Sequence, residues 1–304
     1  IEQGAGDELS LRRNTAALDS LTLRPKFLKD VKERDLSTSV LGTKISLPIM
    51  IDPVAAHRLV HNEGELATAK GAAKSRTLMM VPAYSNFSME EIAKSVSAPR
   101  WFQLYHHNHK ITEGLVRCAE EAGYLAICLT VDVPIPGYHE RDVRNNFSVP
   151  FDFPNFNGTN VVSGADDIPI WLKNEQSPIT WKELDWLRSL SPLPIVVKGI
   201  RTAEDARLAV ESGIDGILVS NHGGRQMDMG ASSIEMLPEI ADAVDGRAEV
   251  YMDSGIRRGA DVLKALALGA RAVAIGRPVF WGLAVDGSDG VTGVLEILRR
   301  EFDL

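Results

Sequence analysis

Apolar and polar residues alternate in blocks along most of the chain. Short apolar runs rich in β-branched residues end in a polar break, and stretches rich in Ala, Glu and Lys follow. Near-continuous apolar runs are typical of parallel strands that are buried on both faces. We therefore predict eight strands, at Ile49–Val54, Leu78–Val81, Trp101–Tyr105, Ala126–Val131, Ile195–Lys198, Gly216–Ser220, Ala248–Met252 and Ala272–Ile275.

The stretches between these strands have helical spacing. Helices are predicted at Gly64–Ser75, Met89–Val96, Thr112–Ala122, Ala203–Ser212, Ile234–Val244 and Gly259–Leu268, with another beginning near Thr180. Alternating strands and helices predict an α/β fold with a parallel sheet covered by helices. Eight units favour a closed (β/α)8 TIM barrel over an open doubly wound sheet, because no Gly-x-Gly-x-x-Gly fingerprint follows the first strand.

Two segments fall outside this rhythm. Residues 1–48 form an N-terminal segment with one loosely helical stretch, from Glu8 to Leu21. The interval from about 134 to 179 holds clusters of Pro, Asn, Gly and Asp, and so long a fourth loop predicts a lid over the catalytic face. No linker separates it from the rest, so residues 1–304 are expected to form a single domain.

Charge and hydropathy narrow the class of protein. With 33 basic and 41 acidic residues the formal net charge is −8, which argues against a nucleic-acid or anionic-membrane surface. No apolar run of about 18 residues could span a bilayer, and no basic start with an apolar core marks a secretory signal. We therefore expect a cytoplasmic protein that acts on a small molecule and has no membrane or nucleic-acid partner.

Candidate chemistry lies where the predicted strands end, because the carboxyl ends of barrel strands meet at one face. After the sixth strand, His222 and Arg225 put a base that titrates near neutrality beside a fixed cation. This pair suits removal of hydrogen from a carbon next to a carboxylate; the alternative is a solvated surface turn. Asp132, after the fourth strand, can orient His222 and stabilise its protonated form.

The last two strand ends predict a phosphate site. Asp253-Ser254-Gly255-Ile256-Arg257 and Gly276-Arg277 supply backbone N–H groups, a helix N-terminus and two arginines. A phosphorylated ligand would then lie across the barrel mouth, where Gln103 and Thr130 can hydrogen-bond a polar ring edge. Lys198 can place a positive charge beside that ring. The alternative for Lys198 is an ion pair with a neighbouring acid.

Taken together, these motifs resemble the FMN-dependent α-hydroxy-acid oxidising family, and within it they look nearest to the L-lactate oxidases. The resemblance covers practically the whole chain and rests on Pro53-Val-Ala-Ala-His, Trp101-Phe-Gln-Leu-Tyr, Leu129-Thr-Val-Asp, Val197-Lys-Gly, Ser220-Asn-His-Gly-Gly-Arg-Gln, Asp253-Ser-Gly-Ile-Arg-Arg-Gly and Ile275-Gly-Arg-Pro.

The resemblance implies a role for each matching residue. His222 resembles the active-site base, Asp132 its partner, Arg225 the arginine on the substrate carboxylate, Tyr105 the tyrosine near the substrate oxygen and Lys198 the lysine at flavin N1 and O2. The positions that match FMN contacts are Pro53, Val54, Ala55, Gln103, Thr130, Ser220, Asp253, Ser254, Gly255, Arg257, Gly276 and Arg277.

The activity so implied is oxidation of an L-2-hydroxy acid to the 2-oxo acid, with O2 reoxidising the flavin and giving H2O2. Ala55 mildly favours an oxidase, since a glycine there is often associated with dehydrogenases in this family. The alternatives are a dehydrogenase that uses a quinone or a protein as electron acceptor, and a flavin-binding barrel that has lost turnover. The resemblance also implies a homotetramer.

Some positions depart from the family pattern. His139 stands where the family has a second carboxylate-binding arginine, so either Arg141 or Arg144 substitutes for it or the substrate is larger or less acidic. Pro82-Ala83 replaces a Ser-Ser pair, which removes hydroxyl contacts and should alter the flavin potential. The resemblance places a substrate-binding tyrosine just upstream of Ile1 and a final helix beyond Leu304.

One further cluster of potential metal ligands follows the third strand. His106, His107 and His109 lie close together in the sequence, but no paired carboxylate or cysteine accompanies them. We therefore predict a solvated loop there and no metal site.

Overall fold

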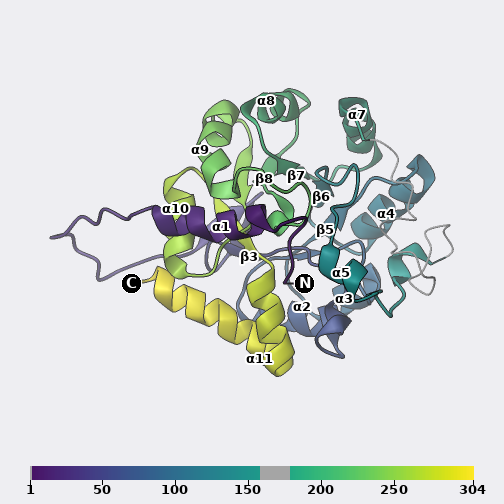
Figure 1. Ribbon diagram of the computed structural model, residues 1–304, viewed down its shortest axis with the longest axis horizontal. Coiled ribbons are helices and arrows are strands. Elements are labelled where there is room, and N and C mark those ends of the chain that lie inside the picture. The colour runs from purple at the N-terminus through teal and green to yellow at the C-terminus, as the bar shows by residue number, and fades with distance from the viewer. Residues whose placement is uncertain (1, 158–178) are drawn as a thin grey trace.

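Eight parallel strands close into a barrel with helices around its outside (Figure 1). The computed structural model describes residues 2–157 and 179–304. The strands are β3 Ile49–Ile51, β4 Met79–Val81, β5 Arg100–Leu104, β6 Ile127–Thr130, β7 Ile195–Ile200, β8 Gly216–Val219, β9 Glu249–Met252 and β10 Ala272–Ile275. Strand β10 pairs in parallel with both β9 and β3, which closes the ring. The predicted (β/α)8 barrel is confirmed, and each of the eight predicted runs overlaps one strand, although β5 begins one residue earlier and β7 ends two residues later than predicted.

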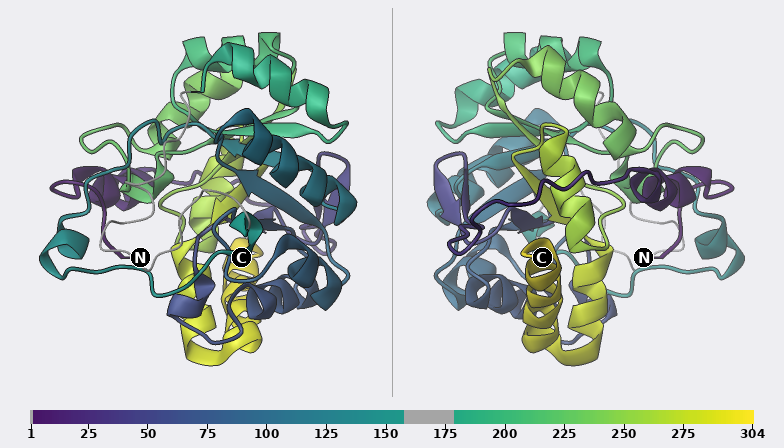
Figure 2. Two further views of the ribbon diagram at one scale, coloured as in Figure 1. Left: turned by 90° about the vertical axis from the view of Figure 1, so that its right-hand side faces the viewer. Right: turned by 90° about the vertical axis from the view of Figure 1, so that its left-hand side faces the viewer.

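The outer helices lie where the sequence predicted them, with one large exception. They are α2 Gly64–Lys74, α3 Met89–Ser95, α4 His109–Glu121, α7 Trp181–Leu190, α8 Ala203–Glu211, α9 Ser233–Val244, α10 Gly259–Ala267 and α11 Arg277–Phe302. Helix α11 was not predicted, because Asp286 and Gly287 have non-helical backbone angles and interrupt its pattern. Its two arms lie side by side (Figure 2) at a close approach, since a Cβ on Gly290 would lie 1.9 Å from the carbonyl oxygen of Gly282. Glycine is required there.

The N-terminal segment is more structured than predicted. It contains α1 Leu9–Ser20, as the pattern indicated, and an unpredicted antiparallel hairpin of β1 Thr38–Val40 and β2 Thr43–Ile45. Helix α1 is fixed to the loop after β8, because the side-chain amides of Asn14 and Asn221 exchange hydrogen bonds of 2.9 and 2.8 Å. This loop carries His222, so the N-terminal segment helps to hold the barrel mouth.

Inward-facing side chains fill the barrel and set the position of everything above them. Successive residues of a strand point to opposite faces, so the residue two positions after an inward-facing one also faces inward. Trp101 and Tyr251 are fully buried inside the barrel, with ring centroids 5.5 Å apart. The inward-facing residues and those two positions later are Met50 and Asp52, Met80 and Pro82, Trp101 and Gln103, Cys128 and Thr130, Val196 and Lys198, Leu218 and Ser220, Tyr251 and Asp253, and Ala274 and Gly276.

The second member of each pair belongs to one layer at the carboxyl end of the barrel, which we call the top layer. It is mostly polar, whereas the layer beneath it is apolar. Apolar side chains thus fill the barrel beneath a polar layer, which favours a functional site at this end of the barrel. In the described part of the chain, no helix is long and apolar enough to cross a membrane.

Candidate active site

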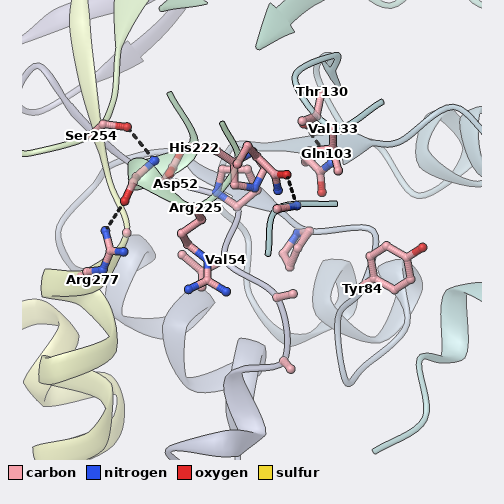
Figure 3. A pocket seen from close by; sticks show the side chains of 18 of the residues that line it. Asp52, Val54, Tyr84, Gln103, Thr130, Val133, His222, Arg225, Ser254 and Arg277 are labelled. Atoms are coloured by element: carbon pink, nitrogen blue, oxygen red, sulfur yellow. Dashed lines mark hydrogen bonds between the residues drawn. The ribbon is translucent and has the colours of Figure 1, made fainter. Parts of the chain in front are cut away.

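A cavity opens above the top layer, at the carboxyl ends of the barrel strands. The predicted site residues that line it are Pro53, Val54, Ala55, Gln103, Tyr105, Thr130, Lys198, His222, Arg225, Ser254, Gly255, Arg257, Gly276 and Arg277. In Figure 3, Arg277 and Ser254 lie at one end, Gln103, Thr130 and Tyr84 at the other, and His222 between them. The cavity is therefore elongated, with a cationic end and a hydrogen-bonding end.

At the hydrogen-bonding end, two neighbouring strands present a fixed pair. Gln103 donates from Nε2 to Oγ1 of Thr130 at 3.0 Å, and its Oε1 accepts from the backbone N–H of Ala83 at 3.2 Å. Both side chains are almost fully buried, so their orientation is held by these bonds. Next to them, burial and then the charge of Asp132 raise the pKa of the Tyr105 phenol, which keeps its proton.

Lys198 lies in the floor between these ends. Its Nζ is 2.9 Å from Oδ2 of Asp253 and donates to Oγ of Ser220, also at 2.9 Å. Burial acts to lower the pKa of Lys198, but the charges of Asp253, Asp52 and Asp132 outweigh it and raise the pKa well above its usual value. Lys198 is thus both a partner in a buried ion pair and a permanent cation facing the cavity, so the two alternatives for this residue hold together.

The base and its acid partner meet as the sequence indicated. Nδ1 of His222 lies 2.9 Å from Oδ1 of Asp132. His222 has a left-handed backbone, with φ of 58°, and its N–H donates to Oγ of Ser220. Asp132 is held against Gly199, where a Cβ would lie 2.6 Å from that of Asp132. Burial would raise the pKa of Asp132, but the charge of His222, the hydrogen bond to it and the charge of Lys198 hold it below its usual value.

At the cationic end, three arginines converge on one region of the cavity. Arg225 donates to the backbone carbonyl of Gln3 at 2.9 Å, and Arg257 to that of Ile256 at 2.8 Å. Within residues 2–157 and 179–304, neither forms an ion pair with a carboxylate. Burial, followed by the charges of Arg225 and Arg257, lowers the pKa of Arg277 to about 10. Cations gathered in one buried region favour the binding of an anion.

His139 lies beside Arg225, and the two candidate substitutes for a second arginine do not reach the cavity. Arg141 forms an ion pair with Glu8, and Arg144 forms one with Glu140. His139 lines the cavity, with Nε2 2.9 Å from the carbonyl oxygen of Arg225 and Nδ1 3.6 Å from a carboxylate oxygen of Asp142. Burial, followed by the charge of Arg225, lowers the pKa of His139.

Three of the predicted site residues do not line the cavity but support those that do. Asp132 stands behind His222, and Ser220 and Asp253 lie under Lys198. Asp52 is an acidic residue of the cavity floor that the sequence prediction missed. Asp52 occupies the top layer at the end of β3, and its only sequence signal is an acid between the apolar Ile-Met-Ile run and Pro53.

The prediction of a solvated histidine loop after β5 was wrong for two of its members. His106 and His107 are buried, and Oγ1 of Thr112 contacts both, by accepting from the backbone N–H of His107 and approaching Nδ1 of His106. Asn108 caps α4, so the helix begins at His109, earlier than expected. The loop is folded into the helix start, which its polar composition did not reveal.

The predicted lid is described only in part. Residues 158–178 lie outside the described residues. Before them, the short helix α5 Glu140–Arg144 and the turn Pro154–Phe156 lie in the interval, and residues such as His139, Phe147 and Phe153 line the cavity. The interval therefore supplies part of the cavity wall, and its opening and closing stay a prediction.

Comparison with known proteins agrees with this geometry. A family model described as FMN-dependent dehydrogenase matches residues 1–304. The chain is 48% identical to an L-lactate oxidase of Nostoc sp., over 99% of this chain and 86% of that protein. It is 46% identical to 2-hydroxyacid oxidase 1 of Homo sapiens, over 99% and 85% of the two chains. A solved mandelate oxidase variant with (S)-mandelic acid superposes with a TM-score of 0.90 at 43% identity, covering 99% of this chain and 86% of that one.

Proposed function

Since the chain belongs to the FMN-dependent dehydrogenase family, we propose that it oxidises a lactate-like L-2-hydroxy acid to the 2-oxo acid. The substrate loses two electrons and two protons, and O2 takes up both as H2O2. The observation that carries the proposal is the His222–Asp132 pair at 2.9 Å, set beside Arg225 in the same cavity. Relatives with oxidase names among both the curated proteins and the solved structures support O2 as the acceptor.

The cavity residues fit FMN at both ends. Arg257 and Arg277 suit its phosphate, while Gln103, Thr130 and Lys198 suit the polar edge of its ring. A Cβ on Gly276 would lie 3.1 Å from Val54, so glycine keeps open the cavity wall where β3 and β10 end. When bound, FMN supplies the acceptor for two electrons from the substrate.

The side chains then have distinct tasks in moving the proton. Asp132 accepts a hydrogen bond from Nδ1–H of neutral His222, which leaves Nε2 as the acceptor. We assign Nε2 as the base that takes a proton from the substrate. The ionised carboxylate of Asp132 then stabilises the imidazolium that forms. Because its pKa is raised, Tyr105 stays protonated and can donate to the substrate oxygen.

Recognition of the substrate carboxylate falls to Arg225. Arg141 and Arg144 are engaged by acids outside the cavity, and burial favours the neutral form of His139. One charged clamp in place of two predicts weaker binding of the carboxylate, by about 1.5–3 kcal/mol. Tyr84, Phe153 and Val133 add apolar wall near the site, which suits a substrate with an apolar side chain.

An anaerobic visible spectrum of the purified protein tests the proposal. The protein is titrated with L-lactate, glycolate, L-mandelate and longer 2-hydroxy acids, and then opened to air. We expect a yellow flavin band that one or more of these acids bleaches and that air restores rapidly. The order of bleaching would rank the substrates.

Other outcomes would each contradict a different part of the proposal. Slow recovery in air would indicate a dehydrogenase with another electron acceptor. A yellow protein that no hydroxy acid bleaches would refute the substrate class, and a colourless protein that binds no added FMN would refute the cofactor.

Two further predictions concern the oligomeric state and the cellular location of the protein and not its cavity. A homotetramer and a cytoplasmic location stay predictions. Light scattering on the purified protein tests the first, and imaging of the full-length protein in its own cell tests the second.

A further inference from the structure

Asp52 is an acid in the cavity floor for which the mechanism above has no use. It ends β3 in the top layer, and its backbone N–H donates to the carbonyl of Ile275 at 3.0 Å. Its side chain lines the cavity, and the nearest part of the wall is Gly276, where a Cβ would lie 3.6 Å from Oδ2 of Asp52. Oδ1 is buried and has no hydrogen-bond partner among the described residues. A buried carboxylate oxygen without a donor is costly.

The neighbours of Asp52 come from three other strand ends. Asp253 follows β9, Lys198 belongs to β7 and Asp132 follows β6, and all three charges act on Asp52. A hydrogen bond between the carboxyl groups of Asp52 and Asp253 is one of the causes that raise the pKa of Asp52. Two carboxyl groups in contact do not ionise independently, because the second negative charge is repelled by the first.

The hydrogen-bond donors of this cluster, Lys198 and Ser254, already contact Asp253 and Ser220. Lys198 lies 2.9 Å from Oδ2 of Asp253 and donates to Ser220, and the hydroxyl of Ser254 donates to Oδ1 of Asp253 at 2.7 Å. Asp253 is therefore the carboxylate paired with Lys198, but its Oδ2, like Oδ1 of Asp52, has no hydrogen-bond partner among the described residues. A proton on Asp52 would satisfy both groups, because the acid could then donate to Asp253.

We propose that Asp52 is protonated in the resting protein, donates to Asp253, and so leaves the charge of Lys198 available to the ring of FMN. Asp52 is thus a positioning residue that couples flavin reduction to proton uptake. This inference rests on the proposed FMN chemistry. Burial, followed by the charge of Asp253, raises the pKa of Asp52 to about 8, against the opposing effect of Lys198.

The sign of the coupling follows from charge balance. Below its pKa, Asp52 is neutral, and the single charge on Asp253 is balanced by Lys198. Above it, a second negative charge lies beside Lys198. Reduction adds two electrons and one proton to give the anionic reduced flavin, and this new charge favours the protonated form of Asp52. Above about pH 8, reduction should therefore draw a second proton, onto Asp52.

The midpoint potential of the FMN-loaded protein, measured against pH with dithionite and reference dyes, tests this. Its slope gives the number of protons taken up per two electrons. We expect about one proton near pH 7, rising toward two above pH 8, in the wild-type protein. D52N keeps a donor toward Asp253 but cannot ionise, so its count should stay at about one throughout. The matched control is E65Q, since Glu65 is also buried with an unpartnered oxygen, but its Oε1 accepts from the backbone N–H of His57 at 3.1 Å.

Infrared titration supplies a second readout that needs no turnover. A protonated carboxylic acid has a carbonyl stretch that a carboxylate lacks. The wild-type protein and E65Q should show this band at pH 7 and lose it near pH 8, and D52N should lack it. No such band in the wild-type protein, or the same proton count in D52N as in the wild-type protein, would overturn the proposal. Failure to bind FMN or to react with hydroxy acids would instead refute the proposed function. The two outcomes are distinguishable because the potential is measured with dithionite and the infrared titration uses no reductant, so neither depends on turnover of a hydroxy acid.

Discussion

The two ends of the cavity differ in how their charged side chains are arranged. On the side of β6 to β8, His222 and Lys198 each have a carboxylate partner, Asp132 and Asp253. On the side of β9 and β10, burial lowers the pKa of Arg257 and of Arg277, and the charges of Arg225 and Arg257 lower that of Arg277 further. The first side pairs charges of opposite sign, whereas the second brings cations close together.

This difference separates the residues expected to act in turnover from those expected to bind FMN. Buried ion pairs fix geometry, and loss of one partner leaves an uncompensated charge. Buried cations that lie close together are stabilised when an anion binds. Changes on the β6–β8 side should therefore damage turnover or folding while FMN still binds. Changes on the arginine side should damage FMN affinity first.

The largest effect is expected at His222. H222Q removes the base but keeps a polar side chain of similar size, so turnover should fall by about 10³- to 10⁴-fold. Stopped-flow reduction of the FMN-loaded protein by its best hydroxy acid measures this. FMN content is the control and should match the wild-type protein. A variant that loses FMN as well as turnover would show that the two sides are not separable.

The next effect concerns stability rather than turnover. K198M leaves Asp253 and Asp52 in the floor without their cation, and should lower the free energy of unfolding by about 3–5 kcal/mol. Urea denaturation of the FMN-free protein measures it. K70M is the matched control, because Lys70 and Glu63 form an exposed pair whose loss should cost less than about 1 kcal/mol. Equal losses in the two variants would mean that the buried pair contributes no more than a surface one.

The arginine side is tested by two adjacent residues. R257M removes a cation that lines the cavity, and FMN should bind about 10- to 100-fold more weakly, the loss of one charge-assisted hydrogen bond. R258M is the control, since Arg258 is 71% exposed and bonded to Glu301. Fluorescence quenching of FMN gives both dissociation constants. If R258M weakens binding as much as R257M does, the effect comes from net charge and not from the site.

The barrel could be predicted from the sequence because its signal is local. Each strand is a short apolar run, and the period of two puts Gln103, Thr130 and Lys198 on the same face of their strands as the inward-facing Trp101, Cys128 and Val196. Helix α11 was missed for a local reason too, since glycines and Asp286 break its pattern. The hairpin β1–β2 was missed because strands of three residues give almost no periodicity.

The pairing within the site could not be predicted in the same way. Which acid meets Lys198 depends on the register of β7, β8 and β9, and several acids were available in the sequence. Asp52 was read as part of a strand, and only barrel closure brings it to Asp253. The backbone carbonyl of Gln3, which accepts from both Arg225 and Arg277, has no side-chain signal at all.

The smallest effect is expected at His139, which lies between the two sides. Burial, followed by the charge of Arg225, lowers the pKa of His139. The neutral form therefore prevails down to a lower pH than for an ordinary histidine, and the cation appears only in more acidic solution. His139 should therefore add no positive charge to the carboxylate site between about pH 6.5 and 8. H139Q should change KM by less than about fivefold, within the range of one neutral hydrogen bond. Its KM should run parallel to that of the wild-type protein across these pH values. A wild-type KM that falls with acid while that of H139Q stays flat would place a histidine cation on the arginine side, and carboxylate recognition would then be shared with Arg225.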